Sequence, residues 1–208
     1  MNQVCWRVVK LGGSLLERPA VAADLHCWLA HQPPLRTLLV CGGGATVDVL
    51  RRWATLQEMP NPVSHELAIR LMSVNAAWLV TALPAAVLCT SLESCRQVTH
   101  ADCPDRTVHV FDPWPALADD TWFGRGDVLP VGWDVTSDSI AARIAERIAA
   151  DELVLLKSAD YGPASEPVAW RQRAADEGYV DAYFPTASAK VARVRCVGLP
   201  TSEPTDTE

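Results

Sequence analysis

Two stretches near the N-terminus decide the fold: VVKLGGSLL at residues 8–16 and LLVCGGGATVDVLRRW at residues 38–53. Each consists of a short apolar run, consecutive glycines and a segment with helical spacing of apolar residues. A strand, a glycine turn and a helix form the repeating unit of a parallel sheet covered by helices. Glycines at a strand's carboxyl end also let the backbone approach a ligand, and the following helix offers free N–H groups to a phosphate. The two stretches therefore predict an α/β protein with two phosphate cradles on neighbouring strands.

The same alternation of apolar runs and amphipathic stretches continues along the chain of 208 residues. Strands are predicted at residues 4–11, 37–41, 86–89, 107–111, 128–131 and 153–157, with a seventh at 191–197. Helices are predicted at residues 45–56, 66–83 and 137–149, with Ser64 and either Thr136 or Ser137 as N-caps. We therefore expect a three-layer αβα sandwich around a mainly parallel sheet of about eight strands. Residues 1–200 are expected to form one domain.

Composition narrows the function classes. The net charge is −7, and 18 basic residues are scattered among 25 acidic ones, which disfavours a nucleic-acid partner. No apolar run approaches the roughly 20 residues of a membrane span, and the first residues lack the pattern of a secretory signal, so we expect a cytoplasmic protein. The seven cysteines contain no C-x-x-C pair, which disfavours a disulfide framework and a zinc site. Residues 201–208 are polar and acidic and are expected to form a disordered tail.

A third stretch, VGWDVTSDSIAARIAERIAADELVLLKSADYG at residues 131–162, combines a loop, a helix and a strand that ends in a lysine. Asp138 falls in the first turn of the helix, where a carboxylate is either a partner of the helix dipole or a functional group. The chain has only three lysines, at positions 10, 157 and 190, among its 18 basic residues. Lys10 and Lys157 both stand at strand ends beside Gly or Asp, where a compact ammonium can donate to phosphate.

In their order and spacing, the three stretches resemble the amino acid kinase superfamily over about residues 4–162, with a weaker likeness in GYVDAYFP at residues 178–185. Within the superfamily, LPVGWDVTSDSIAARIA (residues 129–145) and SHELAIRLM (residues 64–72) most resemble the small kinase of methanofuran biosynthesis, which phosphorylates an aminomethylfuran methyl phosphate. The resemblance implies ATP, Mg²⁺ and a small-molecule acceptor that receives the γ-phosphoryl group on a phosphate or carboxylate. It also implies an acceptor-side part at about residues 1–125 and a nucleotide-side part at about residues 126–200.

The resemblance assigns roles to matching positions. The catalytic group comprises Lys10, Asp138 and Lys157, with Asp138 organising the lysines. The ATP phosphates fall to Gly12, Gly13, Ser14, Ser137 and Asp160, and the acceptor to Gly42, Gly43, Gly44, Arg51, His65 and Asp134; no metal ligand is assigned. The residues themselves leave alternatives open, because His65 also fits a surface position at a helix start and Arg51 a solvated helix face. Many members have a further catalytic lysine near a C-terminal helix start, where this chain offers only Lys190, in no recognisable motif.

Two other functions are compatible with parts of the pattern. A nucleotide- or oxyanion-binding storage protein would keep the fold without catalysis. A Rossmann-type reductase is disfavoured because Val47 stands where the third fingerprint glycine would fall. A homo-oligomer is expected, since the helix at residues 66–83 is rich in apolar residues for an element facing solvent.

Overall fold

One parallel sheet of six strands forms the centre of the computed structural model, which describes residues 5–93, 107–118, 129–161 and 169–201. The strand order is β3-β4-β2-β1-β5-β6, and every neighbouring pair is parallel. The strands are β1 (Trp6–Leu11), β2 (Arg36–Cys41), β3 (Val87–Cys89), β4 (Val108–Phe111), β5 (Glu152–Lys157) and β6 (Val194–Gly198). The predicted α/β fold with a parallel sheet is confirmed, with six strands in the described ranges where about eight were expected. The division into acceptor-side and nucleotide-side parts stays a prediction.

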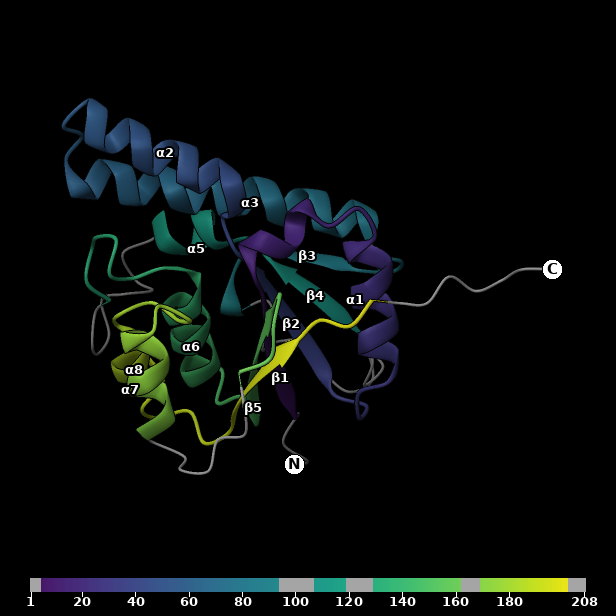
Figure 1. Cartoon of the computed structure of the whole chain (residues 1–208). Helices are drawn as coiled ribbons and strands as arrows, with labels where there is room; N and C mark the ends of the chain where they lie inside the picture. The colour runs from purple at the N-terminus through teal and green to yellow at the C-terminus, as the bar shows by residue number, and fades with distance from the viewer. Residues whose placement is uncertain (1–4, 94–106, 119–128, 162–168, 202–208) are drawn as a thin grey trace.

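Helices cover both faces of the sheet. They are α1 (Val21–Ala30), α2 (Gly44–Leu56), α3 (Asn61–Ala82), α5 (Pro113–Ala118), α6 (Ser137–Arg147), α7 (Ala169–Asp176) and α8 (Phe184–Ala187), with the 3₁₀ helix η1 at Gly13–Glu17. Figure 1 shows α1 on one side of the sheet and α6, α7 and α8 on the other. The long helix α3 belongs to both layers, because Ile69 and Met72 pack in the core with α6 while Ala76 and Leu79 pack in the core with α1.

Three local predictions need correction. Residues 129–131, predicted as part of a strand, form an irregular segment, because Pro130 has no N–H to donate and the following Gly132 has a φ of 155°. The helix α3 begins at Asn61, so Ser64 lies inside its first turns and donates to the Asn61 carbonyl instead of capping the helix. Cys89 is disulfide-bonded, contrary to the expectation, whereas Cys27, Cys41 and Cys196 are free thiols. Residue 128 and the tail from 202 onward lie outside the described residues.

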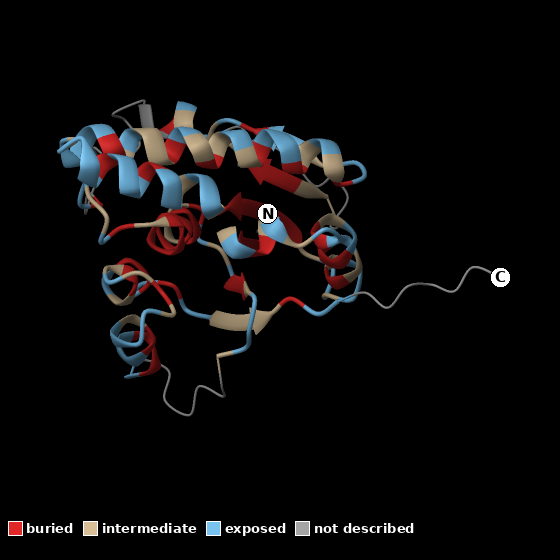
Figure 2. Ribbon diagram, turned by 45° about the horizontal axis from the view of Figure 1, so that its top comes forward, coloured by how far each residue is buried: buried red, intermediate tan, exposed pale blue. Residues whose placement is uncertain are grey.

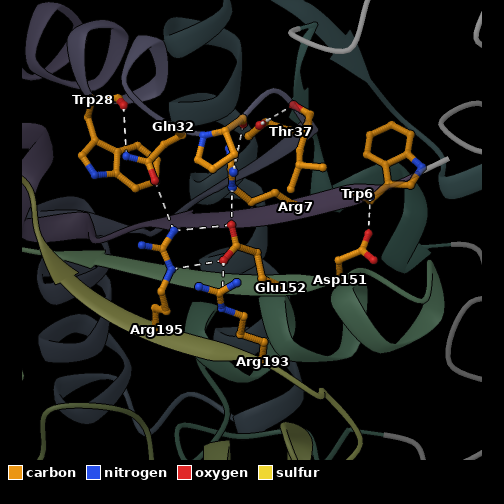
Figure 3. Close-up of polar contacts among 11 residues, drawn as sticks. Trp6, Arg7, Trp28, Gln32, Thr37, Asp151, Glu152, Arg193 and Arg195 are labelled. Atoms are coloured by element: carbon orange, nitrogen blue, oxygen red, sulfur yellow. Dashed lines mark hydrogen bonds and ion pairs between the residues drawn. The ribbon is translucent and has the colours of Figure 1, made fainter. Parts of the chain in front are cut away.

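A buried ionic network joins three strands at the amino ends of the sheet, away from the glycine loops (Figure 3). Glu152 on β5 accepts from Arg7 Nε on β1 at 2.5 Å and from Arg195 Nε on β6 at 3.1 Å. Arg193 adds a longer ion pair at 3.7 Å. Burial raises the pKa of Glu152, but the hydrogen bond from Arg7 and the charges of Arg195 and Arg7 outweigh burial and hold the pKa below its usual value.

We expect Glu152→Gln to lower the free energy of unfolding by about 3 kcal/mol at pH 7, because it leaves the buried Arg7 guanidinium without a counter-charge. The matched control is Glu66→Gln, which removes a half-exposed pair with Arg70 and should cost less than about 0.5 kcal/mol. A carboxylate with a lowered folded pKa stabilises the protein above its unfolded pKa, and that stability is lost as the pH falls through the folded pKa. Urea unfolding should therefore show the gap between wild type and Glu152→Gln closing below pH 4.5, the ordinary value; an equal effect of both substitutions would contradict the prediction.

Candidate functional site

Two lysines share one buried aspartate at the carboxyl ends of β1 and β5. The parallel register pairs Lys10 with Leu155, so Lys157, two residues further on, leaves the same face of the sheet. That face is covered by α6, whose first turn carries Asp138. Asp138 Oδ1 lies 2.9 Å from Lys10 Nζ, and Asp138 Oδ2 accepts from Lys157 Nζ at 2.7 Å. The structure thus brings together the three residues predicted as the catalytic group.

The electrostatics of this cluster come from burial and from mutual charge. The side chains of Lys10 and Asp138 are each 5% exposed, and that of Lys157 is 15% exposed. Burial raises the pKa of Asp138, but the two lysine charges and their hydrogen bonds lower it below its usual value. The pKa of Lys157 is lowered by burial and by the charge of Lys10, against the opposing effect of Asp138. Two cations and one anion leave a net positive charge, as a site for polyanionic phosphate requires.

The two glycine-rich turns pack directly against each other. A Cβ built on Gly13 would lie 2.3 Å from the Gly44 nitrogen, and one on Gly42 would lie 2.6 Å from the Gly13 nitrogen. Gly44 also has a φ of 64°, which favours glycine. A Cβ on Gly12 would approach the Leu156 carbonyl oxygen to 2.9 Å. Gly13, Gly42 and Gly44, predicted from ligand approach, are therefore also required by contact between the two turns, which holds the two candidate cradles face to face.

A cavity of about 220 Å³ opens beside the paired turns, between α2, α3 and the start of α6. Seven predicted site residues contribute to its wall: Gly13, Ser14, Gly43, Gly44, Arg51, His65 and Ser137. Apolar side chains, including Ile69, Met72 and Ile140, form much of the remainder. Ser137 immediately precedes Asp138, so the cavity and the charged cluster adjoin at the start of α6. Lys10, Asp138 and Lys157 themselves do not line the cavity.

Arg51 and His65 both connect to the segment of residues 129–136 that leads into α6. The Arg51 guanidinium lies 4.8 Å from the centre of the Trp133 ring and 3.3 Å from Asp48. His65 Nδ1 lies 3.0 Å from the Gly132 carbonyl oxygen. Burial lowers the pKa of His65 despite the opposing backbone hydrogen bond to Gly132, which favours a neutral ring near pH 7. The position of His65 within α3, rather than at its start, places it on the cavity wall.

Three predicted or considered residues have other surroundings. Asp134 is exposed and is not part of the cavity wall. The Asp160 carboxylate accepts from the backbone N–H of Gly198 at 2.7 Å, which ties the end of β6 to the segment after β5. Lys190, whose side chain is 64% exposed, forms an ion pair with Glu146 at 3.1 Å. Lys157 is therefore the second cation of the charged cluster, and Lys190 is not part of it.

Two contributors to the site were not predicted from the sequence. The backbone carbonyl of Tyr179 accepts from Lys157 Nζ at 2.7 Å. The Asp181 carboxylate accepts from the start of α6, where Thr136 is the N-cap without a cap hydrogen bond from its own side chain. Both lie in GYVDAYFP, the stretch with the weaker family likeness. That likeness was the one indication in the sequence that this stretch is functional. The residues around Asp181 do not indicate which helix it contacts.

A parallel sheet with two lysines sharing an aspartate beside facing glycine turns is the arrangement of an α/β phosphotransferase. The sequence matches the amino acid kinase family over residues 6–161, and the chain belongs to this family.

Solved structures agree at the level of the fold. Uridylate kinase from Archaeoglobus fulgidus superposes with a TM-score of 0.60 at 18% identity, covering 92% of this chain and 91% of that one. UMP kinase from Bacillus anthracis superposes with a TM-score of 0.60 at 12% identity, covering 96% of this chain and 88% of that one. Aspartate kinase from Synechocystis gives 0.61 at 16% identity, covering 96% of this chain and 40% of that one. Among curated protein sequences, none matches this chain.

Proposed function

We propose that the protein is an ATP-dependent small-molecule kinase that transfers the γ-phosphoryl group of ATP to a phosphate or carboxylate acceptor. The observation that carries the proposal is the cluster of Lys10, Asp138 and Lys157 beside the paired glycine turns. In-line phosphoryl transfer needs positioned positive charge around the equatorial oxygens and little proton chemistry by side chains. The two ammonium groups supply that charge, and Asp138 keeps them close together in the absence of substrate.

The nucleotide phosphates are assigned to the cradle of Gly12, Gly13 and Ser14 with Ser137 across the cavity, and Mg²⁺ to the same phosphates. Within the ranges that the structure describes, no group of three His, Cys, Asp or Glu side chains is placed to hold a metal ion. In kinases Mg²⁺ is usually bound by one or two carboxylates together with substrate phosphates and water. When bound, the ion would neutralise phosphate charge alongside the lysines. Asp160 is also proposed to lie near the nucleotide. Its carboxylate accepts from the backbone N–H of Gly198 at the end of β6.

The acceptor is proposed to occupy the cavity between Gly43, Gly44 and α3. Its wall is mostly apolar and carries Arg51 paired with Asp48, and we propose that an anionic group of a compact, partly apolar acceptor contacts Arg51. An aminomethylfuran methyl phosphate, the acceptor implied by the likeness of residues 64–72 and 129–145, has these features. His65 is proposed to contact the acceptor, and Asp134 is kept as a weaker candidate because it lies outside the cavity wall.

The test is ATP turnover by the purified protein, followed as ADP release and by ³¹P NMR of the product. Aminomethylfuran methyl phosphate should be phosphorylated, whereas the same molecule without its phosphate should not. UMP and aspartate serve as comparison acceptors because kinases for them share the fold. ATP binding without transfer to any of these acceptors would favour the alternative, a nucleotide- or oxyanion-binding storage protein. The place of Lys157 in the charged cluster weighs against that alternative.

We also propose that the protein forms a homo-oligomer through α2 and α3. Figure 2 shows long exposed stretches on the outer faces of these helices. Large apolar side chains are exposed there, including Trp53 (61%), Val74 (64%) and Trp78. An apolar groove between the two helices is lined by Val49, Trp53, Leu67, Leu71 and Val74, among others. Such a continuous apolar surface is typical of an interface between proteins.

We therefore expect wild-type protein to sediment as a dimer or larger assembly at micromolar concentration, and Val74→Lys to shift it toward monomer, because the buried interface would then contain an unpaired charge. The matched control is Ala23→Lys on the exposed face of α1, which should leave the assembly unchanged. A monomeric wild type, or an assembly that survives Val74→Lys intact, would contradict the prediction.

None of the helices in the part of the chain that the structure describes is long and apolar enough to cross a membrane. The cytoplasmic location and the absence of a nucleic-acid partner stay predictions from the sequence.

A further inference from the structure

The start of α6 is held by a carboxylate from a distant segment. Asp181 Oδ2 accepts from the backbone N–H of Thr136 at 3.0 Å, from the Thr136 hydroxyl at 2.9 Å and from the backbone N–H of Ser139 at 2.9 Å. Asp181 Oδ1 accepts from the Ser139 hydroxyl. A single carboxylate thereby binds two backbone N–H groups and two hydroxyls around the first turn, and its charge is favourable at the positive end of the helix dipole.

These four hydrogen bonds are made by Thr136 and Ser139, which stand on either side of Asp138 in the chain. Asp138 lies directly before Ser139 and two residues after Thr136, so both anchored residues flank it in the chain. The Asp138 side chain forms ion pairs with the two lysines. A shift of the first helical turn would therefore move the Asp138 carboxylate relative to Lys10 and Lys157.

The same segment also holds one of the lysines. Lys157 Nζ donates to the Tyr179 carbonyl at 2.7 Å, two residues before Asp181, and lies 5.2 Å from the centre of the Tyr179 ring. The Tyr179 hydroxyl donates to the Ala159 carbonyl at 2.7 Å, beyond the end of β5. Residues 179–181 thus connect the end of β5, which carries Lys157, to the start of α6, which carries Asp138.

We propose that Asp181 is a positioning residue for phosphoryl transfer, which fixes the start of α6 so that the Asp138 carboxylate meets both lysines. This inference rests on the proposed kinase function. Asp181 is placed to act through Asp138, because its hydrogen bonds go to Thr136 and Ser139 on either side of that residue. Alanine at this position removes all four contacts, whereas asparagine would keep three of them through its amide oxygen and could donate from its NH₂ group to the Ser139 hydroxyl.

The test compares Asp181→Ala with Asp151→Ala. Asp151 also accepts from a distant backbone N–H, that of Trp6 at 2.9 Å, but at the other end of β1. We expect Asp181→Ala to lower kcat between about 10- and 100-fold, as expected for misplacement of a catalytic group by about 1 Å, with KM for ATP changed less than about threefold. Asp151→Ala should leave kcat unchanged. Thr136→Val, which removes one of the four hydrogen bonds and keeps the side-chain shape, provides a milder variant with a smaller loss of kcat.

A second readout does not depend on turnover. With only three lysines in the chain, ¹⁵N-lysine NMR gives one Nζ resonance for each. In Asp181→Ala the Lys157 resonance should move, because its distance from Asp138 changes, while the resonance of exposed Lys190 should not. If the wild type has no kinase activity, the proposed function fails, and the Lys157 resonance still shows whether Asp181 positions the cluster. A variant that loses only thermal stability, with wild-type kcat and an unmoved Lys157 resonance, would show that Asp181 merely caps the helix and would overturn the proposal.

Discussion

Lys10→Ala should lower turnover by at least about 100-fold while the protein stays folded, as expected when a preorganised charge donor at a phosphoryl-transfer site is removed. Lys10 is buried at the end of β1, with its ammonium 2.9 Å from Asp138, so no other side chain replaces it there. After the substitution, Asp138 keeps one cation, Lys157, and the pair remains neutral. The stability loss should accordingly be modest. Steady-state kinetics with ATP and the identified acceptor, together with a thermal melt, measure both effects.

Lys10→Arg should recover little activity. The lysine side chain is 5% exposed, and a longer planar guanidinium cannot occupy the space of a compact ammonium without displacing its surroundings. Lys190→Ala is the matched control, since Lys190 is exposed, pairs with Glu146 and should be removable without loss of turnover. Near-full activity of Lys10→Arg would show that the phosphate role assigned to Lys10 is wrong. A large loss of turnover in Lys190→Ala would instead indicate that Lys190 is a C-terminal catalytic lysine.

The parts of the site that follow from local patterns could be predicted from the sequence. Lys10 and Lys157 stand at the ends of apolar runs, and parallel strands bring such ends to one edge of a sheet. The helix that carries Asp138 begins at Ser137, where the sequence placed its start. Strand and helix alternation likewise gave the α/β fold, because each element shows its own periodicity.

Contacts between distant segments could not be predicted in this way. Asp181 reaches Thr136 across 45 positions, and no periodicity encodes that pairing. The glycine turns show a related limit, because close contact with a ligand and close contact between Gly13 and Gly44 demand the same residue type. At residues 129–131 the apolar character suggested a strand, but Pro130 and Gly132 favour an irregular segment, and Trp133 and Val135, which follow it, line the cavity.

Asp138→Asn should also lower turnover by at least about 100-fold, since it removes the charge that holds two cations together. From the sequence alone, Asp138 could have been only a helix cap. Asn is an equally good cap, so Asp138→Asn would then leave turnover unchanged. The structure separates the two roles, because the N–H groups at the start of α6 are bound by Asp181, while the Asp138 carboxylate faces Lys10 and Lys157. Unchanged turnover in Asp138→Asn would return Asp138 to a structural role and favour a binding or storage protein.

The structure also predicts that this variant loses stability. Asn in place of Asp138 leaves two buried ammonium groups facing each other without a counter-charge, a loss on the order of 3 kcal/mol, or roughly 6–12 °C in Tm for a domain of this size. Because the folded pKa of Asp138 is lowered, its stabilisation is present above its ordinary pKa and lost as the pH falls. The Tm gap between wild type and Asp138→Asn should therefore be large at pH 7 and shrink in acid. Inorganic triphosphate should narrow the gap at pH 7, because bound phosphate oxygens return negative charge to the lysines; a gap that triphosphate leaves unchanged would place phosphate binding elsewhere.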